Sequence, residues 1–324
     1  MKVLLTGASG FVGSHIRDSL SKRNIPTVVL LRASSDRRFL NHHPKLQVCF
    51  GSINEPETLS AAISSATHVI HCAGCTRAVR PTDFYKINAE GTRNLVQAVN
   101  AAPNVERLVH ISSLAVGGPA TPAAPAKESD IPNPVSDYGK SKLAGELEVR
   151  QNSAVPFTVL RPPAVYGPRD LGFFSVFKAV NLHLQPLPSA TQALSLVYVR
   201  DLAEAVVECL GAARAAGKIY YVAGQQITTA RVFAEEVGRQ MKRWTIRFPL
   251  PSLALWPICV LEELRARLTN HASLLNLQKF EELRARGWVC DPSLLQTELG
   301  IACPTPLPDG IARTLEWYRE QKWL

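Results

Sequence analysis

The sequence of 324 residues lacks the basic runs that are typical of nucleic-acid-binding proteins. Its formal net charge is +9, but no run of five or more basic residues occurs, and Lys and Arg are scattered along the chain. A protein that binds nucleic acid usually gathers its basic residues in a run or a stripe. The charge pattern therefore argues against nucleic acid as a partner. It favours an anionic ligand, such as a phosphorylated small molecule or an acidic membrane lipid.

The sequence also lacks a disulfide framework and a complete set of zinc ligands. Its seven cysteines are an odd number without framework spacing, which indicates reduced thiols in a cytoplasmic protein. Cys72 and Cys75 form a C-x-x-C pair, but no second Cys or His pair completes a tetrahedral site. We therefore expect these two thiols to pack at the end of a strand, and we expect no metal.

No apolar run is long enough to span a bilayer. The N-terminus, MKVLLTGASG, has an apolar run of three residues, which is too short for a signal peptide. The stretch from Phe248 to Val260 is strongly apolar, but it has 13 residues and contains three prolines, whereas a spanning helix needs about 20 residues. Two interpretations stay open for this stretch: packing as core or lid, and peripheral contact with a membrane.

Short apolar runs alternate with helical patterns along most of the chain, which predicts a parallel sheet with crossover helices. Val12, Ile16 and Leu20 recur at helical spacing, so one face of that helix packs on the sheet. Runs that are apolar throughout are typical of strands buried on both faces. The predicted strands are Val3–Thr6, Thr27–Leu31, Leu46–Phe50, His68–Cys72, Leu108–Ser112, Phe157–Leu160 and Ile219–Val222. The fold class is therefore α/β, with a doubly wound parallel sheet as in the Rossmann fold.

A glycine-rich segment directly follows the first predicted strand and opens the first predicted helix. Its glycines, Gly7, Gly10 and Gly13, are spaced as G-x-x-G-x-x-G. A diphosphate binds backbone N–H groups at a helix N-terminus where no side chain stands in the way. This position in the chain predicts a dinucleotide-binding loop. The residues expected to contact the cofactor here are Gly7, Ser9, Gly10, Phe11, Val12 and Gly13.

The end of the second predicted strand carries an arginine where many NAD-binding proteins carry an acidic residue. Arg32 lies 19 residues after Gly13, and Arg37 and Arg38 follow closely. An acidic residue at this point would hold the adenosine ribose hydroxyls and repel a 2′-phosphate, whereas a guanidinium binds a phosphate with two hydrogen bonds. We therefore predict NADP as the cofactor, with NAD as the alternative. The other interpretation of Arg32 is an exposed side chain without a ligand.

Three polar residues have the spacing of an acid–base site. Tyr138 and Lys142 are four residues apart after two good helix caps, Ser136 and Asp137, so both side chains lie on one helical face. A phenol has a pKa near 10, and a nearby ammonium would lower it toward neutral pH. Ser113 follows the fifth predicted strand, at the sheet edge where this class of fold binds its ligand. The competing interpretation is a chance Y-x-x-x-K on an amphipathic helix.

At this point the chain resembles the extended short-chain dehydrogenases/reductases over nearly its whole length. The motifs that carry the resemblance are the glycine triplet, His71–Gly74, Tyr85–Thr92, Ile111–Ser113, Tyr138–Lys142, Arg161–Pro168 and Val197–Asp201. The resemblance implies that Ser113, Tyr138 and Lys142 are catalytic, and that Asn88 helps to order a water and the backbone near Lys142. It also implies further cofactor contacts at Ser52, Ile53, Ala73, Gly74, Pro163 and Val165, besides Tyr138 and Lys142. Ser52 stands where an adenine-binding Asp is usual in the family. A homodimer is expected.

The domain organisation follows from two interruptions of the strand–helix alternation. Residues 117–134 contain five prolines and two glycines, so an extended loop is expected there. After Gly224 the chain becomes mostly helical and less regular. We predict a dinucleotide-binding Rossmann domain of residues 1–165 and 193–224. Residues 166–192 and 225–324 are predicted to form a smaller, mostly helical substrate lobe.

At several positions the sequence departs from the family pattern, and these departures limit which classes of substrate are expected. Ala164 stands where the sugar-nucleotide enzymes of the family carry an Asn for the substrate diphosphate, and Leu194 and Ser195 stand where they carry Arg-Asp. The missing amide and guanidinium are groups that would hold a diphosphate. Leu114 and Ala115 replace the Asp-Glu of the family's dehydratases, which disfavours dehydration because that reaction needs a second acid–base pair.

With the sugar-nucleotide enzymes and dehydratases disfavoured, the chain is most similar to the branch of the family with 3-beta-hydroxysteroid dehydrogenases and dihydroflavonol reductases. Those enzymes act on apolar ring alcohols and ketones. An apolar group at Phe173, Phe174, Val176 and Phe177, with the stretch from Phe248, would suit such a ligand or form plain core. The leading hypothesis is an NADP-dependent oxidoreductase for a hydroxyl or keto carbon of a lipophilic small molecule. The alternatives are a sugar or sugar-nucleotide epimerase with retained dinucleotide, and a non-catalytic dinucleotide sensor. The intact acid–base residues argue against a sensor.

Overall fold

The computed structural model describes residues 1–40, 44–187, 191–249, 252–269, 273 and 277–324. Its main element is a parallel sheet of seven strands in the order β10-β6-β5-β4-β1-β2-β3. The strands are β1 (Val3–Thr6), β2 (Thr27–Leu31), β3 (Leu46–Phe50), β4 (His68–His71), β5 (Arg107–Ile111), β6 (Phe157–Arg161) and β10 (Lys218–Tyr221). The order reverses beside β1, which is the point at which such sheets bind ligands outside the carboxyl ends of their strands.

Both the fold class and the predicted strands are confirmed. The predicted runs coincide with these seven strands to within one residue at each end. In β1, Val3 and Leu5 pack toward one face of the sheet and Leu4 toward the other, and all three are fully buried. Burial on both faces explains why these strands are apolar throughout.

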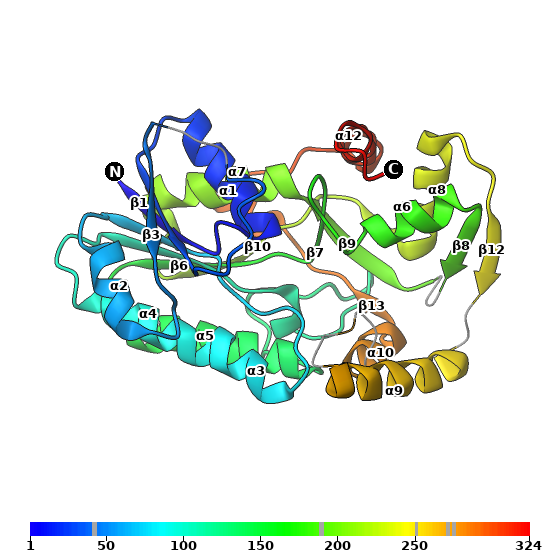
Figure 1. Ribbon diagram of the computed structural model, residues 1–324, viewed down its shortest axis with the longest axis horizontal. Helices are drawn as coiled ribbons and strands as arrows, with labels where there is room; N and C mark the ends of the chain where they lie inside the picture. Colours follow the sequence, from blue (N-terminus) through cyan, green and yellow to red (C-terminus); the bar gives the residue numbers. More distant parts are fainter. Residues whose placement is uncertain (41–43, 188–190, 250–251, 270–272, 274–276) are drawn as a thin grey trace.

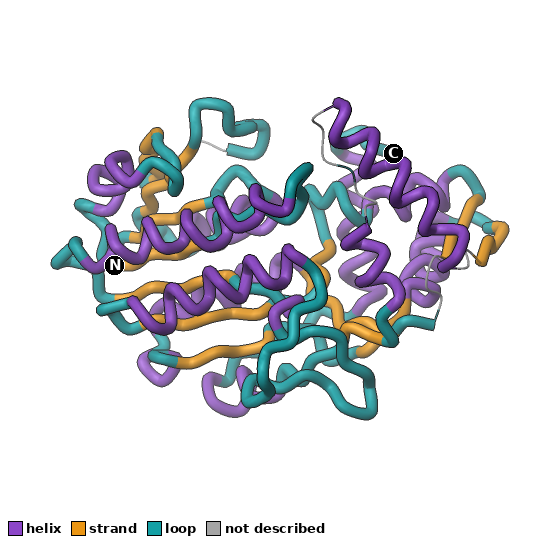
Figure 2. Tube along the Cα trace, turned by 90° about the horizontal axis from the view of Figure 1, so that it is seen from below, coloured by secondary structure: helices purple, strands orange, loops and turns teal. Residues whose placement is uncertain are grey.

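Two layers of helices cover the sheet, as Figures 1 and 2 show. On one face, α1 (Phe11–Lys22), α7 (Val199–Gly211) and α11 (Ser293–Leu299) pack over a core that includes Ile16, Leu20 and Val206. On the other face, α2 (Pro56–Ile63), α4 (Gly91–Asn100) and α5 (Asp137–Asn152) pack over a second core that includes Leu95 and Val149. The predicted apolar stripe of the first helix is thus confirmed. This packing fixes the positions of α1 and α5 relative to the strands of the sheet.

A second sheet of four strands lies beyond the carboxyl ends of the first. It contains β11 (Ile227–Thr229), β9 (Ala193–Tyr198) and β13 (Gly287–Trp288), and β7 (Ala164–Tyr166) pairs with β9. Among the described residues, β9 pairs with β7, β11 and β13, and α7 directly after it packs on the main sheet. A separate ribbon pairs β8 (Leu184–Leu187) with β12 (Ile246–Pro249).

The rest of the lobe is mostly helical, as predicted (Figure 2). Its helices are α6 (Phe174–Asn181), α8 (Ala230–Met241), α9 (Ser252–Thr269), α10 (Leu277–Arg284) and α12 (Leu307–Glu320). The group of aromatic residues at 173–177 packs here with Tyr166, Phe233 and Tyr318, and Phe177 is fully buried. The rings of Phe173, Phe174 and Phe177 contact other rings of this cluster, which favours the core-packing interpretation of that group.

Short irregular helices connect the two sheets and the catalytic segments. They are α3 (Pro81–Tyr85), a π-helical turn at Lys86–Glu90, and 3-10 turns at Leu114–Val116 and Ala213–Ala215. The proline-rich segment 117–134 is extended, as expected, and it is held in place by contacts with other parts of the chain. Isolated bridges join Ala120 to Trp288 and Ala126 to Cys290, so this segment ties the lobe to the main sheet.

Candidate active site

The glycine loop forms a tight turn between β1 and α1. Gly7 has a positive φ of 75°, and a Cβ added there would lie 2.7 Å from the backbone nitrogen of Ala73 at the end of β4. A Cβ on Gly13 would overlap the carbonyl oxygen of Gly7. Both positions therefore accept only glycine. The loop keeps its backbone close to the sheet edge and leaves Ser9, Gly10, Phe11 and Val12 at least partly exposed.

The N-terminus of α1 fits a dinucleotide diphosphate. Gly10 is the N-cap residue, no side chain caps the helix, and its first turn holds no acidic residue. The first N–H groups of the helix are thus available to an anion, at the positive end of the helix dipole. The glycine loop and this helix end are the residues that would hold the diphosphate of a nicotinamide dinucleotide.

Arg32 lies at the carboxyl end of β2 with an exposed side chain, and its backbone N–H donates to Ser35 Oγ at 3.0 Å. Within the part of the chain that the structure describes, its guanidinium makes no ion pair. Arg38, in contrast, pairs with Asp36 at 2.6 Å, and the guanidinium of Arg37 lies 4.9 Å from the centre of the Phe50 ring. Of the three arginines, Arg32 is thus the one whose guanidinium has neither an ion pair nor an aromatic contact among the described residues.

The structure separates the two residues expected at the adenine. Ser52 is partly exposed, and its Oγ accepts a hydrogen bond from Asn54 N at 3.2 Å. Ile53 is instead buried in the core, where a Cβ on Gly91 would lie 2.7 Å from its side chain. Ser52 and the exposed backbone around it therefore offer more contact to a ligand than Ile53 does.

Lys142 is buried beneath the carboxyl end of β5. Its ammonium donates a hydrogen bond to the carbonyl oxygen of Ile111 at 2.6 Å. A Cβ on Gly74 would lie 3.2 Å from Asn88 Oδ1 and 3.8 Å from Lys142 Nζ, so Gly74, Asn88 and Lys142 are neighbours. Burial lowers the pKa of Lys142 from 10.5 to about 8, because the apolar surroundings disfavour its charge. The lysine can therefore give up its proton more easily than an exposed one.

Tyr138 and Ser113 meet at the same edge. Ser136 caps α5 with its Oγ, which accepts from Gly139 N at 3.2 Å, and this cap fixes the first turn that carries Tyr138. Burial raises the pKa of Tyr138 to about 12, and a hydrogen bond with the Ser113 side chain acts in the opposite direction. The effect of Lys142 on this pKa stays a prediction. The ammonium is directed to Ile111, and burial is the larger effect.

Asn88 clamps the strand end that carries Gly74. Its Oδ1 accepts from Cys75 N at 2.8 Å, and its Nδ2 donates to Cys75 O at 2.9 Å and to Ser141 Oγ at 2.9 Å. Ser141 in turn donates to the carbonyl oxygen of Tyr138 at 2.8 Å. Asn88 thus orders the backbone on both sides of Lys142, and its proposed role toward a water stays a prediction.

A buried histidine links the glycine loop to Asn88. His71 contacts Thr6 Oγ1 through Nδ1 at 2.8 Å and Thr92 Oγ1 through Nε2 at 2.9 Å. Thr92 donates to the carbonyl oxygen of Asn88 at 2.7 Å. Burial lowers the pKa of His71 to about 3, so the ring is neutral and acts as a structural link.

A buried ion pair attaches α5 to the sheet next to Ser113. Arg161 on β6 donates to both oxygens of Glu146, at 2.6 and 3.0 Å, and both residues are at most 1% exposed. Ser112 donates to the same carboxylate at 2.9 Å. The pair fixes the register of the catalytic helix against β5 and β6, and the charge of each partner is compensated.

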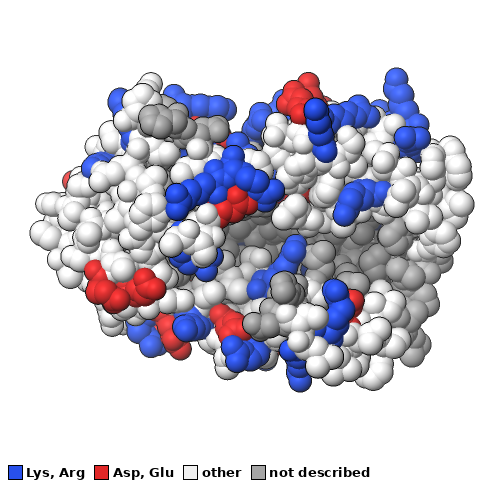
Figure 3. All heavy atoms as spheres, in the orientation of Figure 1, with Lys and Arg blue, Asp and Glu red and all other residues white. Residues whose placement is uncertain are grey.

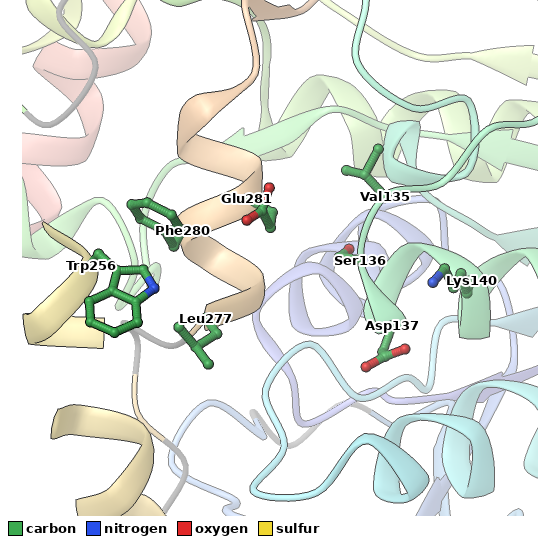
Figure 4. Close-up of a pocket in the computed structure, with 8 residues that line it drawn as sticks. All are labelled: Val135, Ser136, Asp137, Lys140, Trp256, Leu277, Phe280 and Glu281. Atoms are coloured by element: carbon green, nitrogen blue, oxygen red, sulfur yellow. The ribbon is translucent and has the colours of Figure 1, made fainter. Parts of the chain in front are cut away.

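Two features of the site have no signal in the sequence motifs. Ser136 Oγ donates to Glu282 on α10 at 3.0 Å, and the Glu282 carboxylate contributes to the raised pKa of Tyr138. A pocket with a volume of about 380 Å³ opens beside this contact. Figure 4 shows one side formed by Trp256, Leu277, Phe280 and the carboxylate of Glu281, and the other side formed by Val135, Ser136, Asp137 and Lys140. Only the long-range contact between α10 and α5 brings these residues together.

The positions that differ from the sugar-nucleotide enzymes, Ala164, Leu194 and Ser195, offer few polar groups to a substrate. Ala164 on β7 is exposed, next to buried Pro163 and half-buried Val165. Leu194 packs on the aromatic core of the lobe. Ser195 is buried and accepts a hydrogen bond from Cys290 N at 3.1 Å. None of these positions presents an amide or a guanidinium to the site.

The structure also bears on the C-x-x-C pair and on the apolar stretch. Cys72 and Cys75 are partly buried, and burial raises the pKa of Cys72 to about 12. Among the described residues, no group of three or more His, Cys, Asp or Glu side chains could hold a metal ion. No helix in the described ranges is long and apolar enough to cross a membrane. Of the stretch 248–260, residues 250 and 251 lie outside the described residues.

Comparison with known proteins gives consistent matches. Residues 3–223 match the model of the NAD dependent epimerase/dehydratase family. A ceramide reductase of Caulobacter vibrioides is 29% identical, with 99% of this chain and 96% of the relative covered. A UDP-glucose 4-epimerase of Vibrio cholerae is 31% identical over 77% of this chain and 78% of the relative. A solved UDP-glucose 4-epimerase of Thermus thermophilus in complex with NAD superposes with a TM-score of 0.79, at 24% identity and 98% and 99% coverage.

Proposed function

The chain belongs to the NAD-dependent epimerase/dehydratase family of the extended short-chain dehydrogenases/reductases, and from this premise we propose a specific reaction for it. The enzyme transfers a hydride between NADP(H) and a hydroxyl or keto carbon of a lipophilic small molecule, with Tyr138 as the acid or base. The observation that carries the proposal is the meeting of Tyr138, Ser113 and Lys142 at the sheet edge beside an anion-binding helix end.

The protonation of the site suits reduction of a carbonyl group. With a pKa of about 12, Tyr138 is a neutral phenol at neutral pH and can donate its proton to the substrate oxygen. Ser113 can hold that oxygen through its hydroxyl, and Lys142 lies below to stabilise the phenolate that remains. A bound dinucleotide supplies the hydride. The glycine loop, Arg32 and the backbone at Ala73 and Gly74 hold the cofactor.

A lipophilic substrate is supported by what surrounds the site. Ala164, Leu194 and Ser195 offer no group for a diphosphate, and on its α9–α10 side the pocket next to the first turn of α5 is lined by three apolar side chains and one carboxylate, that of Glu281. The relative named ceramide reductase matches nearly the whole chain, and its name denotes reduction of a lipid. NADP in place of NAD is supported by the exposed, unpaired Arg32 among the described residues.

The second candidate is a sugar or sugar-nucleotide epimerase, which is favoured by the relative named UDP-glucose 4-epimerase. Cofactor turnover separates the two, because an epimerase recycles its hydride on a retained dinucleotide, whereas a reductase consumes NADPH. We expect the purified protein to oxidise added NADPH when a lipophilic ketone is present. A tightly held dinucleotide that is never consumed would favour the epimerase.

Calorimetry with UDP or a UDP-sugar provides an independent test of the substrate class. Two missing charge-assisted contacts weaken diphosphate binding by about 3–6 kcal/mol, which turns micromolar affinity into millimolar. Binding tighter than about 50 micromolar would reverse the ranking of the two functions. The division into residues 1–165 with 193–224 and a lobe, the homodimer and the cytoplasmic location stay predictions.

A further inference from the structure

Helix α9 turns an apolar stripe toward solvent. Pro257, Leu261, Leu264 and Leu268 recur at helical spacing and share one face, and all four are exposed, Leu268 to 89%. The opposite face, with Leu255 and Cys259, is buried against Phe280 of α10. A surface helix normally has one apolar face, which packs on the core. The outer face of α9 therefore presents apolar side chains to solvent within the part of the chain that the structure describes.

Basic side chains border this stripe. Arg265 and Arg267 lie on its two sides, and both are well exposed. Their carboxylate partners, Glu262 and Glu263, are much less exposed, so the positive groups reach outward and the negative ones lie beneath them. Figure 3 shows scattered basic side chains, and fewer acidic ones, on the surface visible from this side, in keeping with the net charge of +9. An apolar stripe between two outward guanidiniums is complementary to an anionic lipid surface.

The stripe is also close to the proposed site. Trp256 of α9 lies between the outer face and the pocket of about 380 Å³, which it lines together with Leu277 and Phe280 (Figure 4). On its other side the pocket is lined by the residues that precede and follow Tyr138 at the start of α5. Figure 1 shows α9 as the outermost element at this edge of the molecule, beside α10. A path from the outer surface of α9 to the catalytic helix therefore passes Trp256, Leu277 and Phe280 first and reaches the charged side chains of Glu281, Asp137 and Lys140 deeper in the pocket.

We propose that the outer face of α9 docks on an anionic bilayer and admits a membrane-dissolved substrate through the pocket between α9–α10 and α5. The proposal rests on the proposed function for its lipophilic substrate. Leucines of the stripe enter the acyl region while Arg265 and Arg267 remain among lipid phosphates. A second copy of the chain is the other occupant, and the experiment below distinguishes it from a bilayer.

Flotation of the full-length protein with vesicles tests the docking directly. One vesicle is phosphatidylcholine alone, and the other mixes it with an equal amount of phosphatidylglycerol. We expect the wild type to float with the anionic vesicle, less so at high salt. The variant L261S/L268S should bind at least about tenfold more weakly, because two exposed leucines no longer enter the bilayer. Both positions are exposed, so the fold is retained.

Leu182 provides a matched control, since it is 68% exposed at the end of α6 and Leu261 is 67% exposed on α9. L182S should float like the wild type. Failure of the wild type to float with anionic vesicles, or equal binding by L261S/L268S, overturns the proposal. A wild-type dimer that L261S/L268S splits, with vesicle binding unchanged, would assign the face to a second copy instead. Flotation needs neither substrate nor cofactor, so its failure leaves the proposed hydride transfer untouched.

Discussion

Replacement of Lys142 by methionine should stabilise the fold while it removes activity. Methionine has nearly the length of lysine and carries no charge. In the wild type, burial lowers the pKa of the lysine from 10.5 to about 8, and at ~1.4 kcal/mol for each pKa unit the buried charge costs about 3 kcal/mol at neutral pH. Loss of the hydrogen bond to Ile111 O offsets about 1 kcal/mol of this gain in stability. The variant should therefore be about 2 kcal/mol more stable.

The pH dependence makes this prediction specific. Because the folded-state pKa lies below the unfolded one, unfolding takes up a proton between about pH 8 and pH 10.5. The wild type therefore gains stability as the pH rises through this range. The advantage of K142M should be complete below about pH 8 and should be lost by about pH 10.5.

Thermal unfolding of the cofactor-free protein at about pH 7 and about pH 9.5 measures both effects. We expect K142M to melt roughly 3–4 °C higher at the lower pH and close to the wild type at the higher pH. Lys140 lies on the same helix with an exposed side chain, so K140M serves as the control and should show no such change. A K142M protein that is less stable than the wild type at neutral pH would refute the reasoning.

Four further substitutions test other parts of the site. Tyr138→Phe should lower turnover about 100- to 10,000-fold with the melting temperature and cofactor binding retained, and a drop below about threefold on an identified substrate would remove Tyr138 from catalysis. Arg32→Ala should weaken NADPH binding about tenfold or more and NADH binding little, and equal weakening of the two in a fluorescence titration would contradict a phosphate contact. Gly7→Ala should abolish dinucleotide binding or prevent folding, because its Cβ would lie 2.7 Å from Ala73 N at a positive φ, and wild-type affinity would show that the loop can move. Arg161→Met should destabilise the fold by about 3–5 kcal/mol in urea unfolding, since the buried Glu146 would lose its buried guanidinium partner and keep only Ser112 and the more distant Arg150, and a change below about 1 kcal/mol would show that these two or water compensate the carboxylate.

The sequence predicts the main sheet and the cofactor loop well because both depend on local signals. Strands buried on two faces are short apolar runs, so their limits are visible at the first polar or turn residue. The glycine loop is recognisable because Gly7 and Gly13 occupy places where a Cβ would collide with backbone. Ser113, Tyr138 and Lys142 meet as expected because a helix and a strand end at the same edge place them there.

The rest depends on contacts between distant segments. The pairing of β9 with β7, β11 and β13 has no local signal, since β13 has only two residues. The contact of Glu282 with Ser136 joins residues 146 positions apart. The surroundings of Tyr138 and Lys142 depend on such contacts as well. Spacing places Lys142 on the right face, but only the three-dimensional structure shows its ammonium bound to Ile111 O.

Two stretches of chain that are far apart in the sequence interlock in the predicted lobe, and this limits how its specificity can be engineered. Tyr318 in α12 donates to the carbonyl oxygen of Asp170 at 2.7 Å, and Gly310 leaves space for the ring of Tyr166. A chimera that takes only the C-terminal hundred or so residues from a homologue would pair them with a foreign 166–192 segment and break these contacts. Exchange of substrate preference between relatives therefore requires both stretches to be transplanted as one cassette, with the intervening α7 and β10 left in place.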